Sequence, residues 1–165
     1  MTGYSACLPA AHLTERQSNR VWLACMCGLA PVALAAALAT GWLTLPKVLP
    51  SAAYLLVMLI AAPVIEEYVF RGRLQPWITT FIGDKVASTQ ACPALPAHAA
   101  AIVLTSLAFA TLHWLASPML AVWWVMLPSL ALGVLQAKTG QWQFCAVLHS
   151  SFNAVWCVAI WSQVQ

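Results

Sequence analysis

The sequence predicts an all-α membrane protein, a compact bundle of about five transmembrane helices. Of its 165 residues, 62% are hydrophobic and only 7% are charged. The hydrophobic residues fall into stretches of about twenty, the length that an α-helix needs to cross the hydrocarbon core. One stretch contains the charged cluster Glu66-Glu67-Tyr68-Val69-Phe70-Arg71. Each intramembrane charge costs about 2.5–3.5 kcal/mol on insertion scales, so the cluster must pair, face a wet cavity or do chemistry.

The chain is expected to consist of a short tail and one helical domain. Residues 1–19 are polar and mixed, and we expect a cytoplasmic tail followed by a single transmembrane domain over residues 20–165. The first span is expected over residues 21–45. This hydrophobic run is about twice too long for the core of a signal peptide, so we expect it to be retained.

Four further spans follow, separated by short segments rich in helix breakers. The longest connection is expected at residues 76–96, which contain Gly83, Asp84, Lys85, Pro93 and Pro96. The remaining spans are expected at residues 51–75, 97–116, 119–136 and 142–162.

Positive charge predicts the orientation of the bundle, because cytoplasmic loops carry an excess of Lys and Arg. With the N-terminus in the cytoplasm, one side of the membrane holds five basic residues and the other holds Lys47 alone. The five are Arg16, Arg20, Arg73, Lys85 and Lys138. We therefore expect an integral membrane protein with a cytoplasmic N-terminus.

Composition also excludes some partners. The formal net charge is only +3, and there are no basic blocks and no glycine-rich phosphate loops, so we expect no nucleic-acid partner and no nucleotide cofactor. The expected partners are the lipid bilayer and a membrane-anchored protein or peptide.

Polar residues that can do chemistry recur at a spacing of four on three of the expected spans. The pairs are Glu67 with Arg71, Phe109 with His113, and His149 with Asn153. Residues four apart share a helix face, so three helices can each direct polar groups into one interior pocket. Glu66 is rotated by about 100° from Glu67 and can face a different direction.

Each residue alone also has a structural explanation. Glu67 and Arg71 form an ion pair in any case, a single histidine can bond a backbone carbonyl, and asparagine joins membrane helices. Zinc is the closest rival, because Glu and two His are plausible ligands. The sequence lacks an H-E-x-x-H motif, however, and Arg71 would oppose a cation. We therefore expect no metal and no other cofactor.

These motifs resemble those of the CPBP family of intramembrane proteases, which includes CAAX prenyl endopeptidases and bacterial relatives linked to bacteriocin processing and immunity. The resemblance covers residues 50–160, and Phe70-Arg71-Gly72 and Thr139-Gly140 match flanking family features. The family pattern is EExxxR, then FxxxH, then HxxxN or HxxxB. In this sequence the motifs read Glu66-Glu67-Tyr68-Val69-Phe70-Arg71, Phe109-Ala110-Thr111-Leu112-His113 and His149-Ser150-Ser151-Phe152-Asn153.

The resemblance implies a glutamate-dependent endopeptidase of a bacterial inner membrane that needs no metal. Glu66 would be the general base on a water, His113 would position that water, and His149 and Asn153 would stabilise the oxyanion. Glu67 and Arg71 would support the site as an ion pair.

The implied substrate is a C-terminal sorting segment, as in JDVT-CTERM systems, a leader peptide or a CAAX-like tail. The alternatives are a non-proteolytic immunity or binding protein of the same fold and a small proton or ion transporter.

Overall fold

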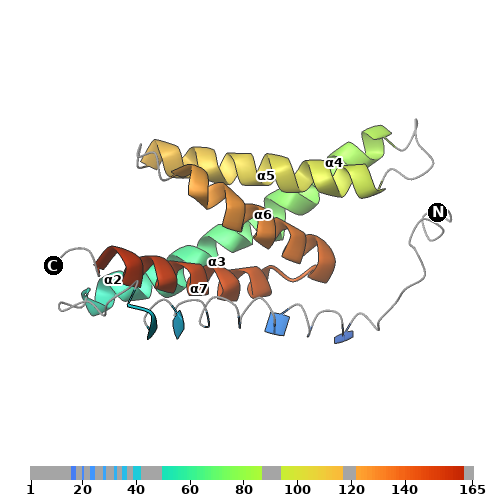
Figure 1. The fold of residues 1–165 in the computed structure, drawn as a ribbon. Helices are drawn as coiled ribbons and strands as arrows, with labels where there is room; N and C mark the ends of the chain where they lie inside the picture. The colour runs from blue at the N-terminus through green and yellow to red at the C-terminus, as the bar shows by residue number, and fades with distance from the viewer. Residues whose placement is uncertain are drawn as a thin grey trace.

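The computed structural model describes residues 50–86, 94–116 and 122–161, together with isolated positions between residues 16 and 41. All elements in the three long ranges are helical (Figure 1). The first is a continuous helix built from α2 (Ala52–Leu56), η2 (Val57–Ala61), α3 (Ala62–Glu67), η3 (Tyr68–Leu74) and α4 (Gln75–Val86), where η marks π-helical turns. It is followed by α5 (Ala94–Ala116), α6 (Val122–Thr139) and α7 (Trp142–Trp161).

The long first helix crosses the bundle diagonally and touches the three others. Its α3 segment packs on α7, and its α4 segment packs on α5 (Figure 1). Side chains of Arg71 and Gln75 bond Ser129 and Gly133, each pair 58 residues apart. This constant offset shows that η3 and α4 run parallel to α6. Gly140 ends α6 with a φ of 67°, a left-handed conformation that glycine adopts without strain.

Both π-helical segments come just before a proline. Pro63 follows η2 by two residues, and Pro76 follows η3 by two residues. Proline has no backbone N–H, and in an α-helix its ring clashes with the carbonyl four residues earlier. A π-helical turn widens the backbone at that point, so the helix continues through both prolines. Glu66 and Glu67 occupy the short α-helical segment between the two π turns.

The predicted connection at residues 76–96 is wrong over residues 76–86, where the helix continues to Val86. Thr79 and Thr80 bond backbone carbonyls of the preceding turn, and Lys85 lies in the last turn, where a cation is favourable. A single Gly83 costs a helix only about 1 kcal/mol, which does not end it.

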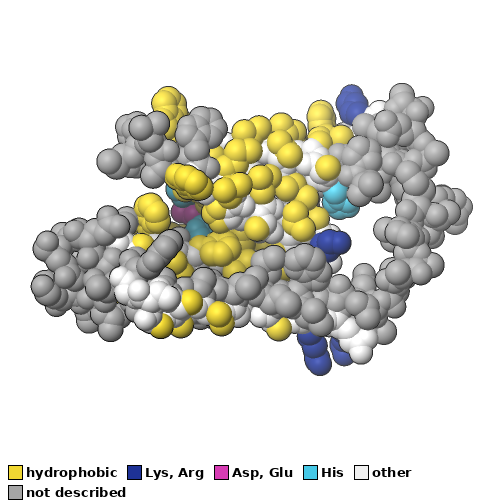
Figure 2. All heavy atoms as spheres, viewed as in Figure 1, with side chains coloured by type: hydrophobic (Ala, Val, Ile, Leu, Met, Phe, Trp, Pro, Cys, Tyr) yellow, Lys and Arg dark blue, Asp and Glu magenta, His cyan; other side chains and the backbone are white. Residues whose placement is uncertain are grey.

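Within the described residues, two helices, Ala52–Lys85 and Ala97–Ala116, are long and apolar enough to cross a membrane, with mean hydropathies of 1.8 and 1.7. Hydrophobic side chains cover much of the described surface (Figure 2). Helices Val122–Thr139 and Trp142–Trp161 lie where the fourth and fifth spans were expected, and that they cross a membrane stays a prediction. The predicted first span at residues 21–45 lies largely outside the described residues, so five spans remain a prediction.

Helices α5 and α6 approach closely at Gly133. A Cβ atom at Gly133 would lie 2.9 Å from Cγ2 of Ile102, whereas one at Gly83 meets nothing within 4 Å. We expect Gly133→Val to destabilise the fold by about 1–3 kcal/mol, as overpacking does in tight cores. Thermal unfolding in detergent measures the effect. Gly83→Ala is the control and should leave the midpoint unchanged or raise it; equal midpoints for both variants would contradict the close approach.

Candidate active site

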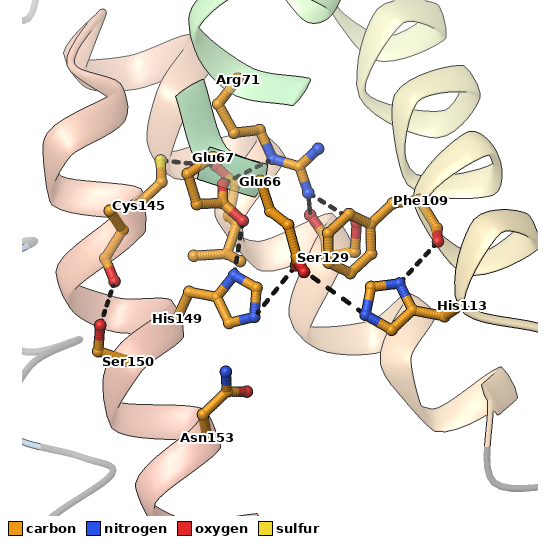
Figure 3. A network of polar contacts seen from close by, with 12 residues as sticks. Glu66, Glu67, Arg71, Phe109, His113, Ser129, Cys145, His149, Ser150 and Asn153 are labelled. Atoms are coloured by element: carbon orange, nitrogen blue, oxygen red, sulfur yellow. Dashed lines mark hydrogen bonds and ion pairs between the residues drawn. The ribbon is translucent and has the colours of Figure 1, made fainter. Parts of the chain in front are cut away.

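The structure brings together the groups that the sequence placed on three separate spans. Glu66 Oε2 lies 3.8 Å from His149 Nε2 and 4.0 Å from His113 Nε2. Figure 3 shows the Glu66 carboxylate between the two imidazole rings. Helices α3, α5 and α7 therefore each supply one group to a single cluster.

Glu67 fixes the position of the His149 imidazole ring. Its Oε1 lies 2.9 Å from His149 Nδ1, and its Oε2 lies 3.4 Å from Arg71 Nε. Both Glu67 and Arg71 are fully buried. The expected ion pair with Arg71 is thus present, but sequence spacing missed the bond to His149, which is 82 residues away. Glu67 joins the positive guanidinium to the imidazole of the cluster.

Arg71 is anchored by helix α6, which carries none of the three sequence motifs. Its Nη2 donates to the Ser129 backbone carbonyl at 2.9 Å and to Ser129 Oγ at 2.6 Å. Ser129 is buried and directly follows Pro128. Sequence reasoning missed Ser129, because a single serine in an apolar helix carries no distinguishing spacing.

Backbone and carboxylate partners fix the orientation of both histidines. His113 Nδ1 lies 3.0 Å from the Phe109 carbonyl, which can only accept a hydrogen bond, so this nitrogen carries the proton. His149 Nδ1 likewise donates to Glu67. In the neutral rings the Nε2 atoms facing Glu66 are therefore acceptors. The Phe109 ring packs between the two, with centroids 4.3 Å from His113 and 5.8 Å from His149.

Asn153 lies one turn beyond His149 on α7 (Figure 3). Its Nδ2 donates to the Met58 carbonyl at 2.8 Å. That carbonyl has lost its helical donors, because the Ala62 N–H bonds Val57 and Pro63 has no N–H. Asn153 thus satisfies a carbonyl that the π turn leaves open and ties α7 to η2. Its role as an oxyanion donor remains a prediction.

The cluster is accessible on one side only. The side chains of Glu66 and His113 are 30% and 36% exposed, whereas those of Glu67 and Arg71 are at 0%. Figure 2 shows acidic and histidine side chains in a recess that hydrophobic side chains border in part. A small reactant can therefore reach Glu66, while the supporting ion pair stays out of contact with water.

Among the described residues, no group of three or more His, Cys, Asp or Glu side chains has the arrangement of a metal site. Arg71, at the end of the Glu67 relay, adds positive charge to the same network. The expectation that the site works without a metal stays a prediction, and it is tested below.

A family model for type II CAAX prenyl endopeptidases, Rce1-like, matches residues 48–155 of the chain. The chain belongs to this Rce1-like family. The match spans the candidate site residues on α3, α5 and α7. No curated protein and no solved structure gives a significant match. Membership of the Rce1-like family identifies the chain as a membrane protein of a peptide-hydrolase family, as the motif resemblance implied.

Ser129→Ala tests the anchoring of Arg71. It removes a buried hydrogen bond to a charged group, and such bonds contribute about 1.5–3 kcal/mol. We expect the free energy of unfolding to fall by that amount, measured by thermal or denaturant unfolding in detergent. The control is Ser150→Ala, because Ser150 Oγ bonds only the Ala146 carbonyl of its own helix. Equal stability of the two variants would contradict the anchoring role of Ser129.

Proposed function

We propose that this chain is an intramembrane endopeptidase of the glutamic type, in which Glu66 activates the water that attacks the peptide bond. The observation that carries the proposal is the partly exposed Glu66 carboxylate, 3.8 Å and 4.0 Å from two histidine Nε2 atoms. Family membership supports the reaction class, and the geometry supports the choice of base.

The distances suit a water bound between Glu66 and His113. A carboxylate oxygen and an acceptor nitrogen 4.0 Å apart can each accept one hydrogen bond of about 2.8 Å from the same water. The two bonds would then meet at roughly 90° at the water oxygen, close to the natural H–O–H angle. Both water protons are held, and a lone pair of the oxygen is left to attack the carbonyl carbon.

His149 is assigned to the negative charge that develops on the substrate carbonyl oxygen. When its Nε2 carries a proton it can donate a hydrogen bond to that oxygen, while Glu67 at Nδ1 fixes the orientation of the ring. A single donor aimed at an oxyanion is worth about 100–1000-fold in rate. Asn153 has a second N–H beside the one bonded to Met58, and we assign this N–H to the same oxyanion.

Glu66 both accepts and returns the proton that is transferred in the reaction. Its carboxylate takes one proton from the attacking water as the C–O bond forms, and the resulting carboxylic acid then donates it to the leaving amine as the C–N bond breaks. The products leave as a carboxylic acid and an amine, which become a carboxylate and an ammonium once the remaining proton is transferred in solution, and Glu66 returns to its starting carboxylate. No covalent intermediate on Ser150 or Ser151 is needed.

The proposed substrate is a membrane-associated protein or peptide that enters the recess from the bilayer. A C-terminal sorting segment of the JDVT-CTERM kind and a leader peptide both present a peptide bond next to an apolar helix. A prenylated CAAX-like tail is the substrate class after which the matched family is described. The recess with its apolar surroundings suits all three.

Glu66→Gln tests the base directly. We expect turnover of a membrane-anchored reporter to fall about 100-fold or more, the size of a general-base contribution. Cleavage is followed by mass spectrometry with purified protein in liposomes. Asp84→Asn is the matched control, because it removes an exposed carboxylate far along α4, and it should keep full activity. Undiminished cleavage by Glu66→Gln would rule out the assigned role.

Metal chelation separates the glutamate mechanism from the zinc alternative. We expect cleavage to continue unchanged after treatment with 1,10-phenanthroline and EDTA, since no step is assigned to a metal. The measurement is reporter cleavage before and after chelation and dialysis. Loss of activity that added Zn²⁺ restores would show instead that Glu66, His113 and His149 hold a catalytic metal.

A further inference from the structure

Most buried residues of the described chain lie on one side of the candidate site, with Pro63 and Cys157 as the exceptions. Helix α5 has buried side chains from Ala97 to Ala110 but none over residues 111–116. In α6 the burial begins at Ser129 and none of residues 124–128 is buried. In α7 none of residues 150–156 is buried, although Cys157 beyond them is. The packed core therefore closes the site at the end of the bundle where α4 and α6 finish and α5 and α7 begin.

Basic residues gather at that same closed end (Figure 2). Lys85 and Lys138 lie in the last turns of the parallel helices α4 and α6. Arg16 and Arg20 line a cavity with Gln141 and Phe144, where α7 begins. Arg73 follows Gly72, which packs on Trp142 at the same point. Apart from the buried Arg71, all described Lys and Arg residues are at this end.

The recess faces the opposite end. His113 lies three residues before the end of α5, and its neighbours Leu112, Trp114 and Leu115 are exposed. Glu66 and His113 are the partly exposed members of the cluster. Between the cluster and the basic end of the bundle lie the buried side chains of Arg71 and Gln75. A reactant therefore reaches Glu66 from the end that carries no described basic residue.

Lys and Arg mark the cytoplasmic side of a bacterial membrane protein. We propose that the recess opens towards the extracytoplasmic face and accepts an anchor segment presented from that face. The substrate class is then a protein that has already crossed the membrane and is held by an apolar C-terminal helix. A prenylated tail attaches to the cytoplasmic leaflet, at the closed end. The substrate class rests on the proposed peptidase function, whereas the orientation of the recess does not.

Site-directed labelling in bacterial cells tests the orientation. Single cysteines are introduced in the full chain as His113→Cys in the recess and Lys138→Cys at the basic end. Cells and inverted membrane vesicles are treated with a membrane-impermeant maleimide, and mass spectrometry locates the label, so native cysteines need no replacement. Leu115→Cys, a 65% exposed neighbour, serves if His113→Cys does not fold.

The expected result is that the residue 113 or 115 cysteine is labelled at least tenfold more in intact spheroplasts, and the residue 138 cysteine at least tenfold more in inverted vesicles. The reverse pattern, or no labelling of the recess from the outer side, overturns the inference.

A second measurement keeps this inference separate from the peptidase proposal. Two reporters carry the same apolar anchor with the candidate cleavage segment on its outer or its inner flank. Cleavage of the outer-flank reporter alone is expected, and cleavage of the inner-flank reporter alone overturns the inference. If neither is cleaved while labelling shows an outward recess, the peptidase function fails and the orientation stands.

Discussion

The buried carboxylate of Glu67 is the constraint on which the rest of the site depends. It lies 2.9 Å from His149 and 3.4 Å from Arg71, and Arg71 in turn bonds Ser129. All four side chains are buried and polar, and removing Glu67 or Arg71 leaves the other charge buried without its ionic partner, at a cost of about 3–5 kcal/mol. The relay joins η3, α6 and α7 through one set of contacts and holds the imidazole of His149 against Glu66.

The two adjacent glutamates are separated in function by the geometry of the helix. Neighbouring residues point about 100° apart on a helix, so Glu67 enters the core while Glu66 faces the recess. Two π-helical turns flank this pair. Because Pro63 has no N–H, the Met58 carbonyl lacks a backbone donor, and the Asn153 side chain donates to it instead. π-helical turns often occur at functional sites. Here the two π-helical turns allow one apolar helix to contain two prolines and two carboxylates without a break.

Sequence spacing predicted the helical class and the meeting of Glu66, His113 and His149, because pairs four residues apart fix which helix face is polar. It could not predict Ser129, the Met58 carbonyl or the bond from Glu67 to His149, since these contacts join helices and have no local pattern. The continuation of the first helix past Gln75 was also missed. In a sequence, Gly83 and Asp84 indicate the end of a helix, yet the long helix continues through both to Val86.

The most direct test of this division of roles compares Glu66→Gln with Glu67→Gln, measuring turnover and thermal unfolding on the same preparations. Glu66→Gln should abolish turnover and leave the unfolding midpoint close to that of the unaltered chain, because its carboxylate is partly exposed and pairs with no arginine. Glu67→Gln should lower the midpoint strongly, since it removes the charge opposite Arg71. A Glu66→Gln protein that still cleaves, or a Glu67→Gln protein with an unchanged midpoint, would contradict the assignment.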